Sequence, residues 1–278
     1  MGQVVHTLNE GEVVCGVTSL AGEIYVLRRK ERDQVEVYDV ITYRLQRCLN
    51  VPNARRFVDM TSCEHYCCIY ISDRIAECRP IHRLDAQGAA TQWPVNDEPW
   101  GLSVNLQHNL LVTCIEAGEI KEFTTDGHIV RTVELPGDVI HPCHTMQTRS
   151  GQFIVCHGSH QRDDAVHRVC MISADGRHIV HSHHGGQPGS DTDDYDGSVH
   201  LAVDNDEFVF VVDVYNRRVM LLSPTLHYVG QVVSTDQLKW WPLRMYLDTQ
   251  KRFLYVADNQ RMLIDNEYVA GRVVVFSV

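Results

Sequence analysis

The sequence predicts an all-β protein, a six-bladed β-propeller of four-stranded antiparallel blades. Three observations carry this prediction: short apolar runs separated by turn residues, a unit that recurs six times, and a spare strand near the N-terminus. The first is clearest in the stretch 199–233, where four short apolar runs alternate with loops containing Asp, Asn and Pro. Loops this short join antiparallel neighbours, and the resulting sheet must pack against further sheets to bury both of its faces.

A repeating unit runs through the whole chain. Aligning the end of the first strand of each unit gives six equivalent residues, which lie 42 to 44 residues apart except for one interval of 57. They are Thr18, Met60, Val104, Met146, Val203 and Leu247. Periods of roughly 40 to 50 residues with four strands per unit are typical of propellers. We therefore expect a single domain over 1–278. Its blades span about 13–53, 54–98, 99–139, 140–193, 194–239, and 240–278 together with 3–8.

The two ends of the chain predict how the ring closes. The last unit stops after its third strand, expected at Arg272–Phe276, whereas an additional strand pattern at Val4–Leu8 precedes the first unit. We expect this N-terminal strand to complete the sixth blade as its outer strand. An open ring would leave two large apolar faces in water, so a closure of this kind is needed.

Two stretches interrupt the regular spacing. His181–Ser198 is rich in Gly, Asp and His and accounts for the longer interval, and we interpret it as a loop between blades four and five. Asn259–Gly271 lengthens the loop between the second and third strands of blade six. Neither stretch marks a boundary between domains.

Composition narrows the classes of function. The formal net charge of −11 disfavours binding to nucleic acids or membranes through bulk charge, although it leaves room for a local basic patch. No apolar run is long enough to span a bilayer. Six of the ten cysteines lie in apolar runs and no C-x-x-C pair occurs, which favours a reduced, cytoplasmic protein over a disulfide framework or a zinc finger. These six are Cys15, Cys67, Cys68, Cys114, Cys156 and Cys170.

Residues in blades five and six resemble a known repeat. FVFVVDVYNRRVMLL carries Asp213, Asn216 and Arg218 in the spacing of the NHL repeat, and FLYVADNQ matches it in part through Asp258 and Arg272. PWGLSV and GSVHLAVD are similar to the family's entry into the inner strand. Blades one to four keep the period but have mostly lost the signature. The chain thus resembles the NHL propellers that end many tripartite-motif proteins, and this resemblance implies a six-bladed binding module.

Several histidines raise the question of a site in the central channel. His144 and His200 fall near the starts of inner strands, beside this channel. Propellers that resemble this fold include amidating lyases, which bind zinc through channel histidines. A zinc site needs three or four ligands, and the residues in register with either histidine offer no such set. We predict no metal and no cofactor, and we keep His144 and His200 as channel candidates.

Other motifs for metal binding or catalysis are absent from the sequence. The acidic run 191–196 fails the calcium-loop pattern, because the fifth position counted from Asp191 is Tyr195 and a count from Thr192 begins without an acid. We interpret this run as a solvated loop. No nucleophile elbow, P-loop or dinucleotide fingerprint occurs, so the sequence predicts no catalytic residues.

The topology of a propeller predicts which loops share a face. The loops between blades and those between second and third strands open on one face, here named the top face. On this face we expect one arc to be basic with Trp residues nearby and the opposite arc to be acidic. Arg and Trp often dominate binding energy at interfaces. The predicted partner-binding residues are Arg28, Arg29, Lys30, Arg32, Arg55, Arg56, Trp100, Arg217, Arg218, Lys239, Trp240 and Arg244. Arg74, Arg79 and Trp241 extend the arc, and Glu98, Glu116 and the acids of 191–196 oppose it.

Three hypotheses of function follow from the sequence. The first is a monomeric, non-catalytic propeller that recognises a protein or peptide partner through its top face, with no membrane partner. A partner segment with acidic and aromatic residues would suit the basic arc. The alternative is RNA recognition, which the resemblance to tripartite-motif propellers permits. The third is a channel-site enzyme of the lyase or lactonase type.

Overall fold

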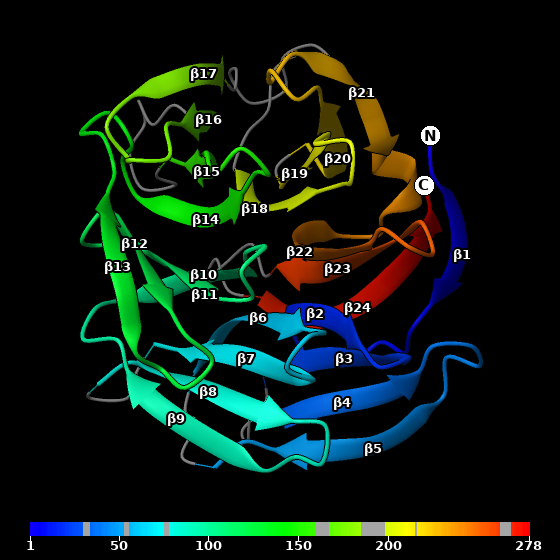
Figure 1. Cartoon of the computed structure of the whole chain (residues 1–278). Coiled ribbons are helices and arrows are strands. Elements are labelled where there is room, and N and C mark those ends of the chain that lie inside the picture. The colour runs from blue at the N-terminus through cyan, green and yellow to red at the C-terminus, as the bar shows by residue number, and fades with distance from the viewer. Residues whose placement is uncertain are drawn as a thin grey trace.

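The computed structural model confirms the six-bladed propeller (Figure 1). It describes residues 1–29, 34–52, 56–74, 78–158, 167–184, 198–214, 216–261 and 268–278. Six sheets of four antiparallel strands surround a central axis. Within these ranges the single helical segment is the 3-10 turn η1 (Thr235–Gln237), and no helix is long and apolar enough to cross a membrane.

Each blade runs outward from the axis in chain order. Blade one holds β2 (Val14–Leu20), β3 (Glu23–Arg28), β4 (Gln34–Asp39) and β5 (Leu45–Asn50). Blade two holds β6 (Phe57–Cys63), β7 (Cys68–Asp73), β8 (Pro80–Asp85) and β9 (Ala90–Pro94). Blade three holds β10 (Pro99–Val104), β11 (Leu110–Cys114), β12 (Glu119–Phe123) and β13 (Ile129–Glu134).

The second half of the ring repeats this order. Blade four holds β14 (Pro142–Gln147), β15 (Phe153–His157), β16 (Arg168–Ile172) and β17 (Ile179–His184). Blade five holds β18 (Ser198–Val203), β19 (Val209–Asp213), β20 (Arg218–Leu222) and β21 (Tyr228–Val233). Blade six holds β22 (Trp241–Asp248), β23 (Phe253–Arg261), β24 (Tyr268–Ser277) and β1 (Gln3–Thr7).

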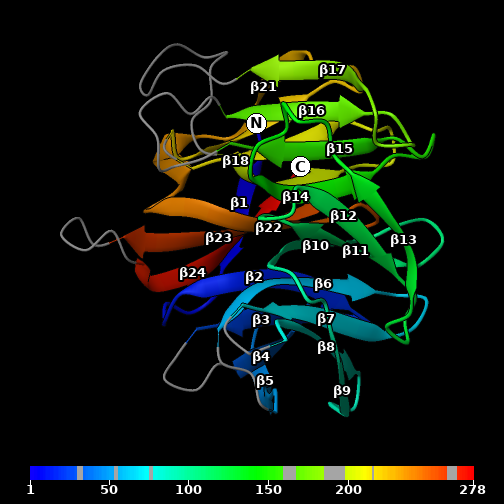
Figure 2. The same ribbon diagram turned by 90° about the vertical axis from the view of Figure 1, so that its left-hand side faces the viewer.

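The N-terminal strand closes the ring, as predicted. β1 pairs antiparallel with β24, with Gln3 opposite Ser277 and Thr7 opposite Val274, and the two termini lie side by side in Figure 1. The expected loop at Asn259–Gly271 is wrong in part, because β23 and β24 continue to pair as far as Arg261 and Tyr268. This extension gives backbone donors and acceptors partners that a loop would leave to water. It carries the two strands beyond the edge of the ring at the left of Figure 2.

The expected loop at His181–Ser198 also needs correction at its ends. Its first four residues belong to β17, the outer strand of blade four, where Met171 pairs with His181 and Arg168 with His184. Ser198 begins β18. Residues 185–197, including the acidic run, lie outside the described ranges. The alternating burial along β17 is typical of an edge strand with one face on the core.

The hydrophobic core consists of six layers, one at each junction between neighbouring blades. Tyr25 and Leu27 of blade one, for example, pack in one buried cluster with Phe57 and Ile69 of blade two. Each of the remaining pairs of neighbouring blades, including blades six and one, is joined by a corresponding cluster. Each fully buried side chain of this size contributes about 1.5–3 kcal/mol. Packing between blades therefore buries both faces of every sheet.

The ten cysteines are free thiols, and seven of them are buried. Cys67 departs from the expectation that it lies within a strand. It is exposed in the turn between β6 and β7 with a φ of 47°. The turn requires this left-handed conformation, which the alternation of apolar residues does not reveal.

Candidate functional site in the central channel

All six inner strands line the channel, and each enters it through a β-bulge. The register shifts fall between Val14 and Gly16, Phe57 and Asp59, Pro99 and Gly101, Pro142 and His144, Ser198 and Leu201, and Pro242 and Arg244. A bulge re-aims the side chain that follows it. Four of these entries direct ionisable side chains, Asp59, His144, His200 and Arg244, into one buried group, here named the channel cluster.

Glycine at two of the other entries lets the blades approach closely. A Cβ on Gly101 would lie 2.4 Å from the carbonyl oxygen of Cys143 and 2.8 Å from Cα of His144. A Cβ on Gly16 would lie 2.8 Å from Cβ of Met60. Only glycine fits these contacts, so blade three sits directly against the backbone that carries His144.

Asp59 is the centre of the channel cluster. Its carboxylate is 1% exposed, and Oδ2 accepts a 2.8 Å hydrogen bond from the backbone N–H of Leu102. Oδ1 lies 3.2 Å from Nε of Arg244 and 3.5 Å from Nε2 of His200. Burial favours the neutral acid, but the charges of His200 and Arg244 outweigh it and hold the pKa of Asp59 at about 2. Asp59 is therefore a buried, ionised carboxylate whose charge is balanced by Arg244.

His144 is held in one neutral tautomer by the backbone. Nε2 lies 3.0 Å from the carbonyl oxygen of Leu102, which only accepts, and Nδ1 accepts from the N–H of Leu201 at 3.4 Å. The proton must therefore be on Nε2. Burial, together with the neighbouring His200, lowers the pKa of His144 to about 3. The ring stacks on His200 with centroids 3.9 Å apart.

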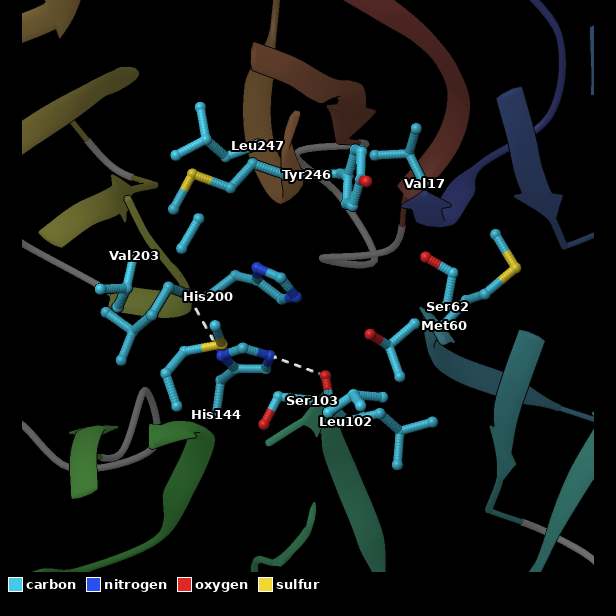
Figure 3. A pocket seen from close by; sticks show the side chains of 16 residues that line it. Val17, Met60, Ser62, Leu102, Ser103, His144, His200, Val203, Tyr246 and Leu247 are labelled. Carbon is cyan, nitrogen blue, oxygen red and sulfur yellow. Dashed lines mark hydrogen bonds between the residues drawn. The ribbon is translucent and has the colours of Figure 1, made fainter. Parts of the chain in front are cut away.

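His200 differs from His144 in having one free ring nitrogen. Its Nε2 faces the carboxylate of Asp59, whereas Nδ1 is buried and has no hydrogen-bond partner in the described part of the chain. Burial lowers the pKa of His200, and the nearby Asp59 opposes this only in part. The imidazole projects toward the middle of the channel in Figure 3.

The channel cluster does not suit a metal ion. One possible ligand atom from each of Asp59, His144 and His200 lies within 4.8 Å of the others. Nε2 of His144, however, carries the proton that the carbonyl oxygen of Leu102 accepts. Arg244, whose Nη2 donates to the carbonyl of Val58 at 3.0 Å, brings a cation to Asp59 through Nε at 3.2 Å. A second group, Asp97, Cys114 and Glu119, holds Lys121, whose Nζ lies 3.1 Å from Glu119. In both places a side-chain cation neutralises the carboxylates.

Below the channel cluster lies a cavity of about 180 Å³. His144 and His200 form one end of it, and residues from all six inner strands form its wall (Figure 3). Aliphatic side chains and methionines make up most of the wall, and the hydroxyl side chains of Thr61, Ser62, Ser103 and Tyr246 lie among them. A largely apolar cavity with a few polar groups is typical of sites that hold small molecules.

Three predicted partner-binding residues are buried, which corrects their assignment to an exposed face. Arg28 is 1% exposed and donates to Glu36 and to the carbonyls of Glu12, Asn9 and Gly271, so it ties blade one to blade six. Arg218 pairs with Asp213 at 2.7 Å, and Arg244 belongs to the channel cluster. The sequence analysis assigned all three to loops of the top face, whereas they lie in β3, β20 and β22 with their side chains turned inward.

The remaining residues of the predicted arc are accessible to different degrees. Arg56 is exposed, Arg29 is half-buried and donates to the carbonyl of Phe57, and Arg217 donates to the carbonyl of Thr235. Lys30, Arg32 and Arg55 lie outside the described residues. The arc is less basic than expected, because acids neutralise it: Arg74 pairs with Glu98 at 2.6 Å, Arg79 with Glu116 at 3.0 Å, and Lys239 with Glu10 at 2.8 Å.

Two tryptophans stand half-buried on the top face beneath cations. Arg74 lies over Trp100 at 5.2 Å from the ring centroid. Trp240 has Lys239 at 4.3 Å and Arg272 at 5.8 Å. Trp100 lies in the bulge at the start of β10 and Trp240 directly precedes β22, so both stand where an inner strand begins, on the same face. Trp100 also packs against the core between blades four and five, and Trp241 packs against the core between blades five and six.

Asp59 is the residue of the channel cluster that the sequence analysis did not single out. By the repeat spacing, Val58 is the residue in register with His144, and Asp59 lies one position beyond it. The bulge between Phe57 and Asp59 shifts it into the channel. An acid at the entry of an otherwise apolar inner strand, FVDM, was the available signal.

Comparison with known proteins supports the propeller fold but shows no family for the chain. No family model and no curated protein matches the sequence. Among solved structures, a PQQ-bound aldose sugar dehydrogenase from Streptomyces coelicolor is similar with a TM-score of 0.68 and 11% identity, covering 99% of this chain and 98% of that one. A streptogramin B lyase has a TM-score of 0.62 and 14% identity, with 95% and 87% covered. The β-propeller domain of Cps50 (Swd1) from Myceliophteria thermophila gives 0.62 and 12%, with both chains covered completely.

At these identities the likeness shows the fold alone. The neighbours include two enzymes of different chemistry, a lyase and a dehydrogenase. The ring therefore serves unrelated functions, and function must be argued from the residues of this chain. The resemblance to the NHL repeat stays an expectation based on the residues of blades five and six.

Proposed function

We propose that this chain is a non-catalytic binding propeller that recognises a protein partner through its top face. The observation that carries this proposal is the pair of tryptophans, Trp100 and Trp240, each presented half-buried beneath a cation on that face. Indole rings in such positions bury a large area at a small cost in side-chain entropy. They are suited to anchor a partner segment that carries acidic and aromatic residues.

Two features favour a protein partner over the other hypotheses. Among the described residues of the arc, Arg74, Arg79 and Lys239 are paired with Glu98, Glu116 and Glu10, which weakens the continuous positive potential that RNA requires. In the channel, the backbone engages both ring nitrogens of His144, and the cation of Arg244 beside Asp59 helps to keep the pKa of that carboxylate low, so neither group is suited to accept a proton at neutral pH. Both features support binding without catalysis.

The test compares two variants on opposite faces of the ring. Trp240→Ala removes the top-face anchor, and Tyr66→Ala, in the turn between β6 and β7 on the other face, is the matched control with a side chain 40% exposed. Each variant and the wild type are used to capture partners from a cell extract, with quantitative mass spectrometry. The affinity of a captured protein is then measured with purified components.

We expect Trp240→Ala to weaken binding of the captured partner at least tenfold, in line with a hot-spot aromatic residue, and Tyr66→Ala to leave it within about twofold. Equal loss in both variants, or loss only in Tyr66→Ala, would contradict the proposal. A short randomised RNA pool is titrated at two salt concentrations in parallel. Tight RNA binding with a steep salt dependence that Arg56→Glu abolishes would replace the protein partner by RNA.

A further inference from the structure

The junction between blades five and six is closed differently from the other five junctions. In each of blades one to five, a turn joins the third strand to the outer strand and packs against the preceding blade. Leu226 of blade five is buried in the cluster between blades four and five, and Tyr43 of blade one stacks on His6 of β1 with ring centroids 4.3 Å apart. In blade six the third and outer strands, β24 and β1, belong to opposite ends of the chain, so no turn joins them.

The turns of blades two, three and four show the same contact with the preceding blade. Each places a glycine directly against an apolar side chain of the preceding outer strand. A Cβ on the glycine would lie 3.3, 2.6 and 2.4 Å away in the contacts of Gly88 with Leu49, Gly127 with Trp93 and Gly176 with Val133. Val232 holds the corresponding place on β21 of blade five, as the fifth residue of its strand, but it lines a groove instead.

This groove has a volume of about 470 Å³. Phe208, Phe210 and Leu221 of blade five form its apolar floor together with Val232, and Gln3 of β1 borders it from blade six. The two ends of the chain mark its place beside β21 in Figure 1. The groove opens on the face opposite the top face, because turns between first and second strands border it. Sites for small molecules typically have volumes of about 300–1,000 Å³.

The rim of the groove carries more negative than positive charge. Asp204 and Asp206 lie in the turn between β18 and β19, and Arg252 lies in the turn between β22 and β23. Oδ1 of Asp204 accepts hydrogen bonds from the backbone N–H groups of Asp206 and Phe208 at 2.9 and 2.8 Å. Neither carboxylate forms an ion pair with a residue that the structure describes, whereas Nε of Arg252 donates to the carbonyl oxygen of Val278 at 2.8 Å.

We propose that this groove binds a small organic cation with an apolar body, of the size of an aralkyl amine. Its apolar part packs on Phe208 and Phe210, and its ammonium group pairs with Asp204 and Asp206. Burial of the apolar part supplies the affinity, and the excess of carboxylates selects the sign of the charge. The site lies on the face opposite Trp100 and Trp240, so it does not depend on the proposed protein partner.

The first test compares three probes of similar shape on the wild-type chain. Phenethylamine carries a cation, 2-phenylethanol a neutral hydroxyl group and 3-phenylpropanoate an anion. Ligand-observed NMR gives the three affinities, and the methyl resonances of Leu221 and Val232 report whether each probe binds in the groove. We expect phenethylamine to bind about fivefold tighter than 2-phenylethanol and the anion to bind most weakly, because a partly exposed charge pair is worth about that factor. High salt should narrow the difference.

Two variants with matched controls locate the binding. Gln3→Trp places a large side chain in the groove from an exposed position of β1, and Gln46→Trp makes the same change at an exposed position of β5 in blade one. Asp206→Asn removes a charge from the rim, and Asp126→Asn removes an exposed charge from the turn between β12 and β13. We expect Gln3→Trp to weaken binding of phenethylamine at least tenfold and Asp206→Asn to reduce its advantage over 2-phenylethanol to about twofold. Both controls should leave the affinities unchanged.

Each outcome decides the proposal. Preferred binding of phenethylamine with shifts at Leu221 and Val232 supports it. Equal affinity for the amine and the alcohol, or tighter binding of the anion, would overturn the class of ligand. No binding of any probe, or binding that Gln3→Trp leaves unchanged, would overturn the site. The comparison of the three probes on the wild-type chain stands even if Gln3→Trp disturbs the fold.

Discussion

Blade six and the channel both bury a carboxylate beside an arginine, yet the two arrangements hold different parts of the molecule. Asp258 is fully buried and pairs with Arg272 at 2.8 Å, directly across the ladder between β23 and β24. Asp59 bonds instead to Leu102 of blade three and faces His200 and Arg244 of blades five and six.

The difference lies in which elements each carboxylate joins. Pairs such as Asp258–Arg272 and Asp213–Arg218 fix one hairpin inside one blade. The channel cluster fixes blades to one another across the axis. Loss of a pair within a blade should therefore loosen that blade, whereas loss of Asp59 should loosen the whole ring. Four predictions test this comparison, in order of decreasing effect.

The largest effect is expected from Asp59→Ala. The substitution leaves Arg244 buried without its carboxylate and leaves the N–H of Leu102 without an acceptor. Removing one partner of a buried ion pair costs about 3–5 kcal/mol. Urea denaturation measures the free energy of unfolding, and hydrogen exchange should accelerate in the inner strands of several blades.

The control for Asp59→Ala is Asp206→Ala, which removes an exposed acid from the turn after β18 and should change stability by less than about 0.5 kcal/mol. The double variant Asp59→Leu with Arg244→Met removes both charges and should recover part of the loss. A loss below about 1 kcal/mol for Asp59→Ala would show that the cluster does not hold the ring.

A smaller and local effect is expected from Arg218→Met. Asp213 loses its 2.7 Å partner but keeps the side-chain amide of Asn216 at 3.1 Å. A hydrogen bond to a charged group is worth about 1.5–3 kcal/mol, which sets the expected loss. Hydrogen exchange should accelerate in β19 and β20 alone. Acceleration throughout the inner strands would remove the distinction between the two kinds of pair.

Acid should destabilise the ring through the channel histidines. The pKa of His144 is about 3 in the folded state against an ordinary 6.5, so below pH 6.5 the unfolded chain takes up a proton that the folded chain does not. Stability is complete above pH 6.5 and is lower by about 2 kcal/mol at pH 5 through His144, with His200 acting in the same direction. Asp59 contributes only as the pH falls further, toward 2.

The variant His144→Gln isolates this effect. Its side-chain amide can still donate to Leu102 but does not titrate, so the difference in unfolding free energy between pH 7.5 and pH 5 should shrink by about 2 kcal/mol. Denaturation curves at both pH values provide the measurement. An unchanged difference would assign the acid sensitivity to other groups.

The smallest effect is expected from Lys239→Gln. The pair of Lys239 with Glu10 joins blade six to the N-terminal segment but is half-exposed on both sides. Water screens such a pair, so the melting temperature should not change measurably. A clear decrease would mean that surface pairs also help to close the ring.

The regular part of the fold could be predicted because it is periodic. The spacing of Thr18, Met60 and Val104 and their equivalents records one unit six times, and the spare strand at the N-terminus matches the vacant edge of blade six. The extension of the hairpin of β23 and β24 could not be predicted, because its residues lack the alternation of apolar and polar residues that marks a half-buried strand. The two strands continue there through backbone hydrogen bonds to each other.

The candidate site was predicted only in part. The positions of His144 and His200 near the starts of inner strands predicted that they lie beside the channel. The sequence did not predict that Asp59 and Arg244 lie next to them. The bulge at each entry adds one residue, and a shift of one residue changes the direction of a side chain. A search at a single level of the repeat therefore separates groups that the folded chain brings together.

The sequence by itself determined the number of blades and the closure of the ring, because both follow from the unit that the chain repeats. Only the tertiary structure decided that Asp59, His144, His200 and Arg244 meet at the axis and that Arg28 turns inward. Leu102, the nearest backbone partner of Asp59, already lies 43 residues away. Contacts across that distance are set by the packing of whole blades, which no local pattern records.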